Sequence, residues 1–249
     1  ISPHPQDGWA VHDLVRRARI VALSQDGPEA EHAFHERAEN AWRKRYGLTR
    51  QPDDIAEALY HSFFTDEPRA MEEWGDLVGE HTLIADRHVW RTVVLVPSDV
   101  SLAERPLSAN HVAEASYHQG RWYYYGAEWD AALETYQQAL GLFRQVGARL
   151  GEANTLQSIG LLYAQADDMD TALAYLHEAH ALHSAIHDRY SCGVDSFYRA
   201  EILASLGRPT EACADLEFAL EVFTELQLPY ADWARTRLEA LHREQQPAR

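Results

Sequence analysis

Four histidines on one stretch of the chain have a spacing that suits metal binding. They are His177, His180, His183 and His187. Steps of three, three and four residues place side chains on one face of a helix, where imidazoles can share a metal ion such as zinc. Because histidine titrates close to neutral pH, the same stripe could instead form a pH-sensitive joint between helices.

Residues forty positions away favour a third interpretation of two of these histidines, His180 and His183. The equivalent positions before and after them carry Leu140, Phe143, Leu220 and Phe223. We therefore expect His180 and His183 to be half-buried core residues with satisfied ring nitrogens, and we expect no bound metal.

No other arrangement in the sequence suggests catalysis. It has no Ser/His/Asp constellation, no metal-hydrolase motif and no glycine-rich loop with Lys-Ser/Thr that would cradle a phosphate. Two cysteines, Cys192 and Cys213, are too few for a disulfide framework and fit a reducing, cytoplasmic environment. We expect both to be small apolar core residues, with a redox pair as the alternative. Neither enzymatic activity nor a cofactor is expected.

A dense aromatic cluster, Arg121-Trp122-Tyr123-Tyr124-Tyr125, contains the residue types that most often anchor interfaces. Tyr123 falls on the core side of its helix. We expect others of the cluster to contact a partner, with packing against the preceding segment as the alternative.

Composition limits the class of that partner. The chain has 249 residues and a net charge of −17, which argues against direct nucleic-acid binding, since that depends on Lys and Arg neutralising phosphates. The longest apolar run, Val93–Val96, is far shorter than the ~20 residues of a membrane-spanning helix. No signal peptide is visible, and the initial Ile1 suggests a fragment of a longer protein.

The second half of the chain repeats with a period of forty residues. Its middle unit, Ala153–Ile186, reads as two amphipathic helices. The matching positions in three successive units are Gly120, Gly160 and Ala200; Tyr123, Tyr163 and Leu203; Ala132, Ala172 and Ala212; and Ala139, Ala179 and Ala219. A period of this length is typical of solenoids, and small side chains are needed where neighbouring helices approach to about 8–10 Å.

This pattern of small, aromatic and alanine positions resembles the tetratricopeptide repeat over residues 109–243. The usual unit of that family has about 34 residues, and the longer unit here is similar to members found in kinesin light chains and bacterial regulators. Ser116, Leu156 and Ser196 replace the early Trp of the family, and its terminal Pro is absent. The resemblance implies an all-α fold, a right-handed α–α superhelix, with a helical linker in front of it.

In tetratricopeptide repeats the first helix of each unit lines a concave groove that binds a protein or peptide. Carried over to this chain, the resemblance implies a groove formed by Tyr117, Arg121, Tyr124, Tyr125, Asn154, Gln157, Leu161, Gln165, Phe197, Tyr198 and Glu201. The Lys/Asn arrangement that grips peptide carboxylates in chaperone-binding members is missing, so a chaperone-adaptor role is not expected.

A second resemblance lies near the start of the chain. Residues 11–16, VHDLVR, resemble the His-Asp signature that closes the winged-helix part of signal-transduction ATPases with numerous domains, in which the His helps to hold nucleotide. Asp54–Tyr60 is similar to the helical segment that joins ATPase to repeats in bacterial members. A surface His12 on an N-capped helix is the alternative. Without a phosphate loop, this piece alone should not bind ATP.

These patterns predict four segments. They are a winged-helix remnant (1–24), a helical linker with a degenerate hairpin (25–108), three repeats (109–228), and a capping helix with a tail (229–249). The expected linker helices are Glu29–Tyr46 ended by Gly47, a helix capped by Asp53 or Asp54 and reaching Phe64, Arg69–Gly79, and His88–Val96.

The resulting expectation is a recognition and scaffold region from a bacterial multidomain signalling ATPase. It would act in the cytoplasm and bind a protein or peptide, or other domains of its parent chain. Two alternatives remain open: a peptide-pheromone-binding transcriptional regulator, and an enzyme that uses the repeats for docking and has its active site elsewhere.

Overall fold

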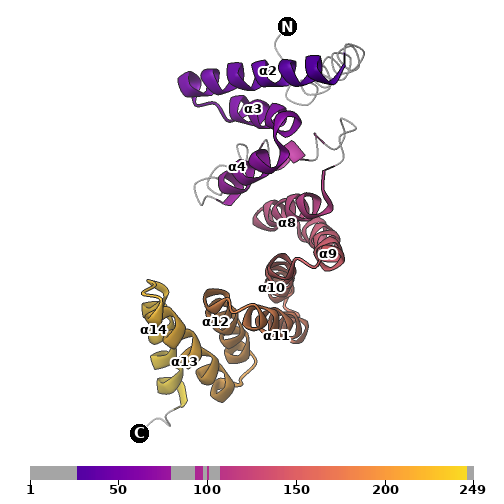
Figure 1. The fold of residues 1–249 in the computed structure, drawn as a ribbon. Coiled ribbons are helices and arrows are strands. Elements are labelled where there is room, and N and C mark those ends of the chain that lie inside the picture. Colours follow the sequence, from indigo (N-terminus) through magenta and orange to yellow (C-terminus); the bar gives the residue numbers. More distant parts are fainter. Residues whose placement is uncertain (1–26, 80–92, 98–99, 101–106, 246–249) are drawn as a thin grey trace. The chain divides into compact units, whose positions relative to one another are not determined.

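The structure is a computed structural model of the chain and describes residues 27–79, 93–97, 100 and 107–245. It divides into two compact units, Ile1–His111 and Val112–Arg249, here called unit 1 and unit 2. Ten α-helices account for most of the described residues (Figure 1), and no β-strand occurs among them. No helix in the described part of the chain is long and apolar enough to cross a membrane.

Unit 1 contains three described helices that pack in chain order: α2 (Pro28–Thr49) against α3 (Pro52–Thr65), and α3 against α4 (Glu67–Gly79). Figure 1 shows them in indigo and purple. Their core residues Ala58, Leu59, Phe63, Ala70 and Trp74 are fully buried. The helix α3 supplies most of this core because every residue from Ile55 to Phe64 except Glu57 is buried.

Two predicted helix ends in unit 1 are wrong. Gly47 does not end the first helix, which continues to Thr49 and ends where Arg50 takes the left-handed conformation, with φ 54°. The residue that caps α3 is Gln51, because Pro52 occupies the first turn, where it needs no N–H partner. Asp53 and Asp54 lie in that first turn, where their negative charge favours the helix dipole.

The buried face of α2 also differs from the prediction. The residues that α2 buries are His35 and Glu39, whereas Ala41, expected on the apolar side, is exposed. Hydrogen bonds to α3 and α4 make this burial of polar groups possible, as described below. The predicted helix His88–Val96 lies largely outside the described residues, as does the proposed winged-helix remnant; Val93, Val94 and Val96 are buried.

Unit 2 consists of seven helices. They are α8 (Ala109–Tyr125, which begins in unit 1), α9 (Trp129–Val146), α10 (Arg149–Gln165), α11 (Met169–Ala185), α12 (Arg189–Ser205), α13 (Pro209–Glu225) and α14 (Tyr230–Gln245). From α9 onward each helix packs against the next one (Figure 1, from magenta to yellow). The sequence pattern predicts these helices at Asn110–Tyr125, Glu128–Val146, Arg149–Ala166, Met169–His187, Arg189–Leu206, Pro209–Leu226 and Tyr230–Arg243, and the bounds agree to within two residues at every end.

The turns between these helices repeat with equal regularity. One residue in every turn has a positive φ, and successive ones are twenty residues apart: Ala127, Gly147, Asp167, His187, Gly207 and Gln227. A left-handed residue at the end of a helix lets the chain reverse and satisfies the last carbonyl groups. Asp168 and Asp188 then cap the following helices, accepting bonds from the backbone N–H groups of Thr171 and Ser191.

Close packing at the small positions confirms their predicted role. A Cβ atom on Gly120 would lie 2.5 Å from the Tyr136 ring, and one on Gly160 would lie 2.9 Å from Cγ of Leu176. The matching alanines on the second helices, Ala132, Ala172 and Ala212, have no exposed surface, and the same is true of Ala139, Ala179 and Ala219. The two cysteines are buried and unbridged.

Candidate binding groove on unit 2

A pocket of about 380 Å³ opens between helices α8, α10 and α12. These are the first helices of successive pairs. Its lining consists of Tyr117, Arg121, Tyr124, Tyr125, Tyr136, Asn154, Gln157, Ser158, Leu161, Tyr190, Val194 and Tyr198. Eight of the eleven predicted groove residues are therefore brought together in one pocket. We call this site the tyrosine pocket, after its six tyrosines.

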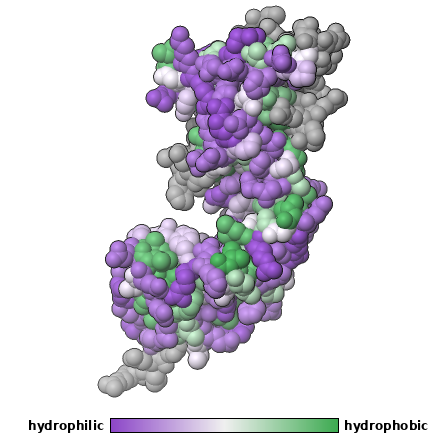
Figure 2. Space-filling view, in the orientation of Figure 1, coloured by the Kyte–Doolittle hydropathy of each residue, from purple (hydrophilic) through white to green (hydrophobic). Residues whose placement is uncertain are grey.

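The other three predicted residues lie elsewhere. Gln165 is exposed near the end of α10. Phe197 and Glu201 line a second, more apolar hollow of about 510 Å³ with α14 residues, among them Trp233, which is 64% exposed. There Glu201 forms an ion pair of 2.8 Å with Arg237. In the view of Figure 2, green hydrophobic patches interrupt the surface of unit 2, whereas the visible face of unit 1 is mostly hydrophilic.

Sequence reasoning missed four residues of the tyrosine pocket. Tyr136 comes from a core position of α9, and Ser158 comes from the position of α10 that is equivalent to Tyr198. Tyr190 and Val194 precede Tyr198 by eight and four residues on α12, so one face of this helix enters the pocket. This helical spacing was the signal that could have found them.

Four phenol groups of the pocket, those of Tyr124, Tyr136, Tyr190 and Tyr198, have a raised pKa, remain protonated at neutral pH and can donate hydrogen bonds. Burial raises the pKa of Tyr124, with a smaller effect of Tyr198 and Tyr125, and this outweighs a hydrogen bond with Gln165. Burial likewise raises the pKa of Tyr198, and that of Tyr136 lies well above the usual value. Phenols that keep their proton offer the pocket both donors and acceptors.

Arg121 is the one formally charged side chain that lines the pocket. Its guanidinium lies 6.0 Å from the centre of the Tyr117 ring, within the range of a cation–π contact. Its Nη1 donates to Nδ1 of His118 at 3.4 Å. Burial and the adjacent Arg121 charge lower the pKa of His118 to about 3, so this histidine is neutral and accepts.

Below the pocket, four polar side chains from three helices form a network. On α10, Gln157 Nε2 donates to Oδ1 of Asp195 at 2.6 Å. Nδ1 of His183 lies 2.7 Å from the other carboxylate oxygen of Asp195, and Nε2 of His183 lies 3.1 Å from Oδ1 of Asn154. His183 and Asp195 are fully buried. The network therefore joins two pocket residues of α10 to α11 and α12, and we call it the dyad network.

The histidine stripe thus separates into residues with different surroundings. His183 is fully buried, not half-buried as predicted, and both ring nitrogens have partners. His180 is half-buried against the Phe218 ring, but its Nδ1 has no hydrogen-bond partner; burial, with a smaller effect of the Arg199 charge, lowers its pKa. His177 and His187 are exposed. No group of three metal-ligating side chains occurs in the described residues.

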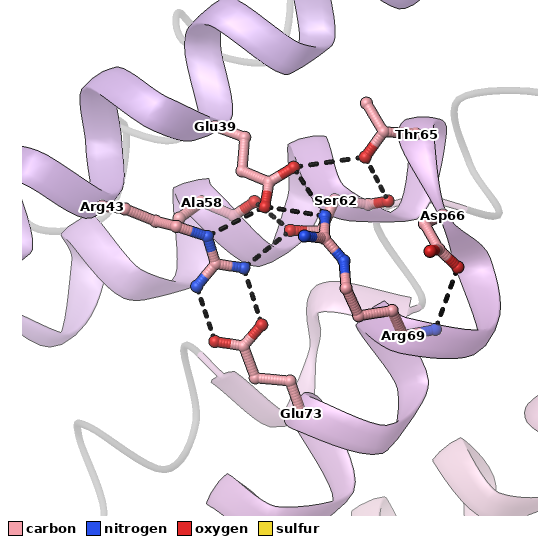
Figure 3. Close-up of polar contacts among 8 residues, drawn as sticks. All are labelled: Glu39, Arg43, Ala58, Ser62, Thr65, Asp66, Arg69 and Glu73. Atoms are coloured by element: carbon pink, nitrogen blue, oxygen red, sulfur yellow. Dashed lines mark hydrogen bonds and ion pairs between the residues drawn. The ribbon is translucent and has the colours of Figure 1, made fainter.

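A second polar cluster ties the helices of unit 1 together (Figure 3), and we call it the arginine cluster. Arg43 of α2 donates to Glu39 at 2.8 Å and, through two nitrogens, to Glu73 of α4 at 2.6 Å. Arg69 of α4 donates to both carboxylate oxygens of Glu39. Ser62 of α3 accepts a fourth bond from Arg43.

Electrostatics within the arginine cluster favour the charged forms. Burial opposes ionisation of Glu39, but hydrogen bonds from Arg43 and Ser62, with the charges of Arg43 and Arg69, outweigh it and lower the pKa of this carboxyl. The bond to Glu73 is the main reason that the pKa of Arg43 is raised. All four carboxylate oxygens of Glu39 and Glu73 accept bonds from arginines inside the cluster.

Comparison with known proteins agrees with this geometry. The tetratricopeptide repeat family matches residues 114–145, so the chain contains a tetratricopeptide repeat formed by α8 and α9. Among solved structures, the chain is similar to BtubC (BKLC) from P. vanneervenii, with a TM-score of 0.55 and 15% sequence identity over 87% of this chain and 84% of that one. Curated protein sequences gave no match.

The predicted fold class is thereby confirmed: an all-α chain with a right-handed α–α superhelix of the tetratricopeptide kind, preceded by a helical segment. Tetratricopeptide repeats generally mediate interactions between proteins. The groove offers tyrosine rings, one guanidinium and two amides on a rigid helical frame, a set of groups suited to non-covalent binding.

Proposed function

We propose that unit 2 recognises a peptide segment of a partner protein in the tyrosine pocket. The observation that carries this proposal is the convergence of six tyrosines, Arg121 and two amides in one pocket formed by the first helices of successive pairs. Tyrosine and arginine bring large contact area and several hydrogen-bonding groups for little loss of side-chain entropy. The pocket is too small for a folded domain, which favours an extended segment.

The wider context that we propose is a multidomain signalling ATPase of bacteria, acting in the cytoplasm. In this proposal residues 1–24 end a winged-helix part, 25–108 form the helical linker, 109–228 hold three repeats, and 229–249 close the array. The partner is a protein or peptide, or another domain of the same parent chain, and nucleic acid and membrane are not partners.

A peptide-pheromone-binding transcriptional regulator is the second candidate, and the size of the tyrosine pocket favours it. The sequence upstream of Ile1 in the gene distinguishes the two: a nucleotide-binding module supports the ATPase, and a helix-turn-helix alone supports the regulator.

The binding proposal is tested by panning the whole chain against a random dodecapeptide library and measuring the affinity of the synthesised peptides by fluorescence anisotropy. The double variant Arg121→Ala/Tyr124→Ala should lose binding and keep the helical content of the wild type in circular dichroism.

A matched control exchanges the same residue types outside the pocket. Arg144 of α9 is 46% exposed, and Tyr175 of α11 stacks on Tyr163. The variant Arg144→Ala/Tyr175→Ala should bind the peptides as the wild type does. Recovery of no binding peptide, or unchanged binding by the Arg121/Tyr124 variant, would overturn the proposal.

A further inference from the structure

We infer that Asn154 and Gln157 form a clip for the main chain of an extended peptide, and that the buried His183 and Asp195 are the positioning residues that fix its polarity. This inference rests on the proposed function. It adds that the ligand is bound through its main chain, and it gives the orientation of the two amide groups that bind it.

The hydrogen bonds of the dyad network decide which end of each amide remains available. Oδ1 of Asn154 lies 3.1 Å from Nε2 of His183, an arrangement in which Nε2 donates and the Nδ2 donor of Asn154 remains. Gln157 uses its nitrogen toward Asp195, so its Oε1 acceptor remains. Neither remaining atom has a hydrogen-bond partner recorded among the described residues, and both side chains line the tyrosine pocket.

Donor and acceptor therefore stand side by side on one helix. Asn154 and Gln157 are separated by three residues on α10, and such side chains are neighbours, with about 5–6 Å between Cβ atoms. In an extended peptide the N–H and C=O groups of one residue point to the same side of the chain. Nδ2 of Asn154 can then donate to the C=O of a ligand residue while Oε1 of Gln157 accepts from its N–H.

Burial of the dyad network fixes the orientation of the Gln157 amide. A free amide can rotate by half a turn and exchange donor and acceptor at little cost. Here a flip of Gln157 would place its oxygen 2.6 Å from a carboxylate oxygen of Asp195, which cannot donate. Asp195 has no exposed surface, so water cannot compensate for the lost bond, and an unpaired buried charge is expensive.

The equivalent positions in the other repeats show that this arrangement occurs once. Forty residues earlier, Phe143 and Thr155 stand in place of His183 and Asp195, and Tyr117 stands in place of Gln157. Phe143 and Thr155 are buried without an ion pair between them. The clip is thus an addition to the repeat and not a requirement of its packing.

The test uses a dodecapeptide recovered by the panning experiment, with each of its N–H groups methylated in turn. In the wild-type chain, methylation at one position should weaken binding about tenfold or more, the loss expected for a buried acceptor left without its donor. In Gln157→Leu the same methylation should have less than a twofold effect. In Gln138→Leu, an exposed glutamine of α9, the tenfold effect should remain.

The second arm addresses the positioning residues. The double variant His183→Phe/Asp195→Thr carries the residues of the first repeat, so it should fold with the wild-type circular dichroism spectrum. It should bind the unmodified peptide about tenfold more weakly and lose the difference between methylated and unmethylated peptide. The donor half of the clip is tested in the same manner. The variant is then Asn154→Leu, and the ligand carries an ester in place of one peptide bond.

The outcomes separate the two proposals. If peptides bind through Arg121 and Tyr124 but no methylated position couples to Gln157, the clip is overturned and the proposed function stands. If the double variant keeps the methylation effect, His183 and Asp195 do not position the amides. If no peptide binds in the tyrosine pocket, both proposals fail together.

Discussion

Two polar clusters lie among the helices of this chain, one in each unit, and they use their hydrogen-bonding groups differently. In the arginine cluster of unit 1, both oxygens of Glu39 and both of Glu73 accept bonds from Arg43 or Arg69. In the dyad network of unit 2, the amides of Asn154 and Gln157 each keep one atom that no described residue engages. Both clusters join three helices, and in the second, Asn154 and Gln157 also line the tyrosine pocket.

This difference separates a polar cluster that holds helices together from one that also prepares a binding surface. A buried carboxylate is costly unless its charge is paired and all its oxygens accept bonds. The arginine cluster meets that requirement within itself. In the dyad network the polar groups of His183 and Asp195 are paired inside the network. The remaining donor of Asn154 and the remaining acceptor of Gln157 lie at the surface of the pocket.

The largest effect is expected from Glu39→Ala in unit 1. Removing this nearly buried carboxylate leaves Arg69 without its partner on α2 and leaves Arg43 with Glu73 as its remaining carboxylate. Because both arginines are partly exposed, we expect a loss of about 2–4 kcal/mol in the unfolding free energy of unit 1. Hydrogen exchange of α2–α4 measures it, and Glu36→Ala, at an exposed position of α2, is the control. Peptide binding by unit 2 should be unchanged.

Next in size is Asp195→Ala in unit 2. The change leaves His183 without its carboxylate and Gln157 without its acceptor, at a cost of about 2–3 kcal/mol in unfolding free energy. Unlike Glu39→Ala, it should also weaken peptide binding about tenfold, because the Gln157 amide can then rotate. If Glu39→Ala and Asp195→Ala weakened peptide binding equally, the proposed difference between the two clusters would be wrong.

Acid should weaken the arginine cluster in a defined pH range. The folded-state pKa of Glu39 lies below its ordinary value of 4.5. The stability that this ionised group contributes is therefore complete above pH 4.5 and is lost as the pH falls through the lower folded-state pKa. Hydrogen exchange of α2–α4 should accelerate below pH 4.5 in the wild type, and this acceleration should be smaller in Glu39→Gln.

A smaller effect on stability is expected from His183→Phe/Asp195→Thr. Replacing a buried ion pair by well-packed residues is often neutral, so the unfolding free energy of unit 2 should stay within about 1 kcal/mol of the wild type. Urea titration followed by circular dichroism measures it. A loss as large as that of Asp195→Ala alone would show that the dyad network is needed for packing.

The smallest effect should come from the exposed ion pairs of unit 2. Arg144, 46% exposed, pairs with Glu152 and Glu178 at 2.7 Å. Exposed pairs contribute about 0.2–1 kcal/mol. We expect Arg144→Ala to lower the unfolding free energy by less than 1 kcal/mol and to leave peptide binding unchanged in anisotropy. A larger loss would mean that surface pairs, and not only the buried clusters, hold the helices together.

The sequence predicted unit 2 far better than unit 1 for a physical reason. Because the repeat shows each position three times, the role of Gly160 or Ala172 could be inferred from the equivalent residues in the other units. Unit 1 has no such repetition, and there the burial of Glu39 depends not only on Arg43, one turn away on the same helix, but also on Arg69, thirty residues away in sequence.

The same limit applies to the tyrosine pocket. Its concave face followed from the repeat, whereas the dyad network did not, because Asp195 replaces the small residues Ala115 and Thr155 of the other units. The histidine in place of Phe143 was visible, and a search for a carboxylate at another exceptional position would have found its partner. Of the expected groove residues, Phe197 and Glu201 line a second hollow with residues of α14 and do not line the tyrosine pocket.

The left-handed turn residues, spaced twenty apart from Ala127 to Gln227, have a consequence for how this chain can change in length. Each residue added inside a helix rotates everything beyond it by about 100°. Inserting one residue between Asn154 and Gly160 would thus rotate one part of α10 relative to the other. Either the amides would then no longer face the pocket, or the glycine would no longer face the residues that pack against it. Additions at the turns keep the angular phase of every helix, and additions of a whole forty-residue pair also keep the alternation of first and second helices. The array can therefore grow or shrink in whole helix pairs or at its loops, while the interior of each helix must keep its length.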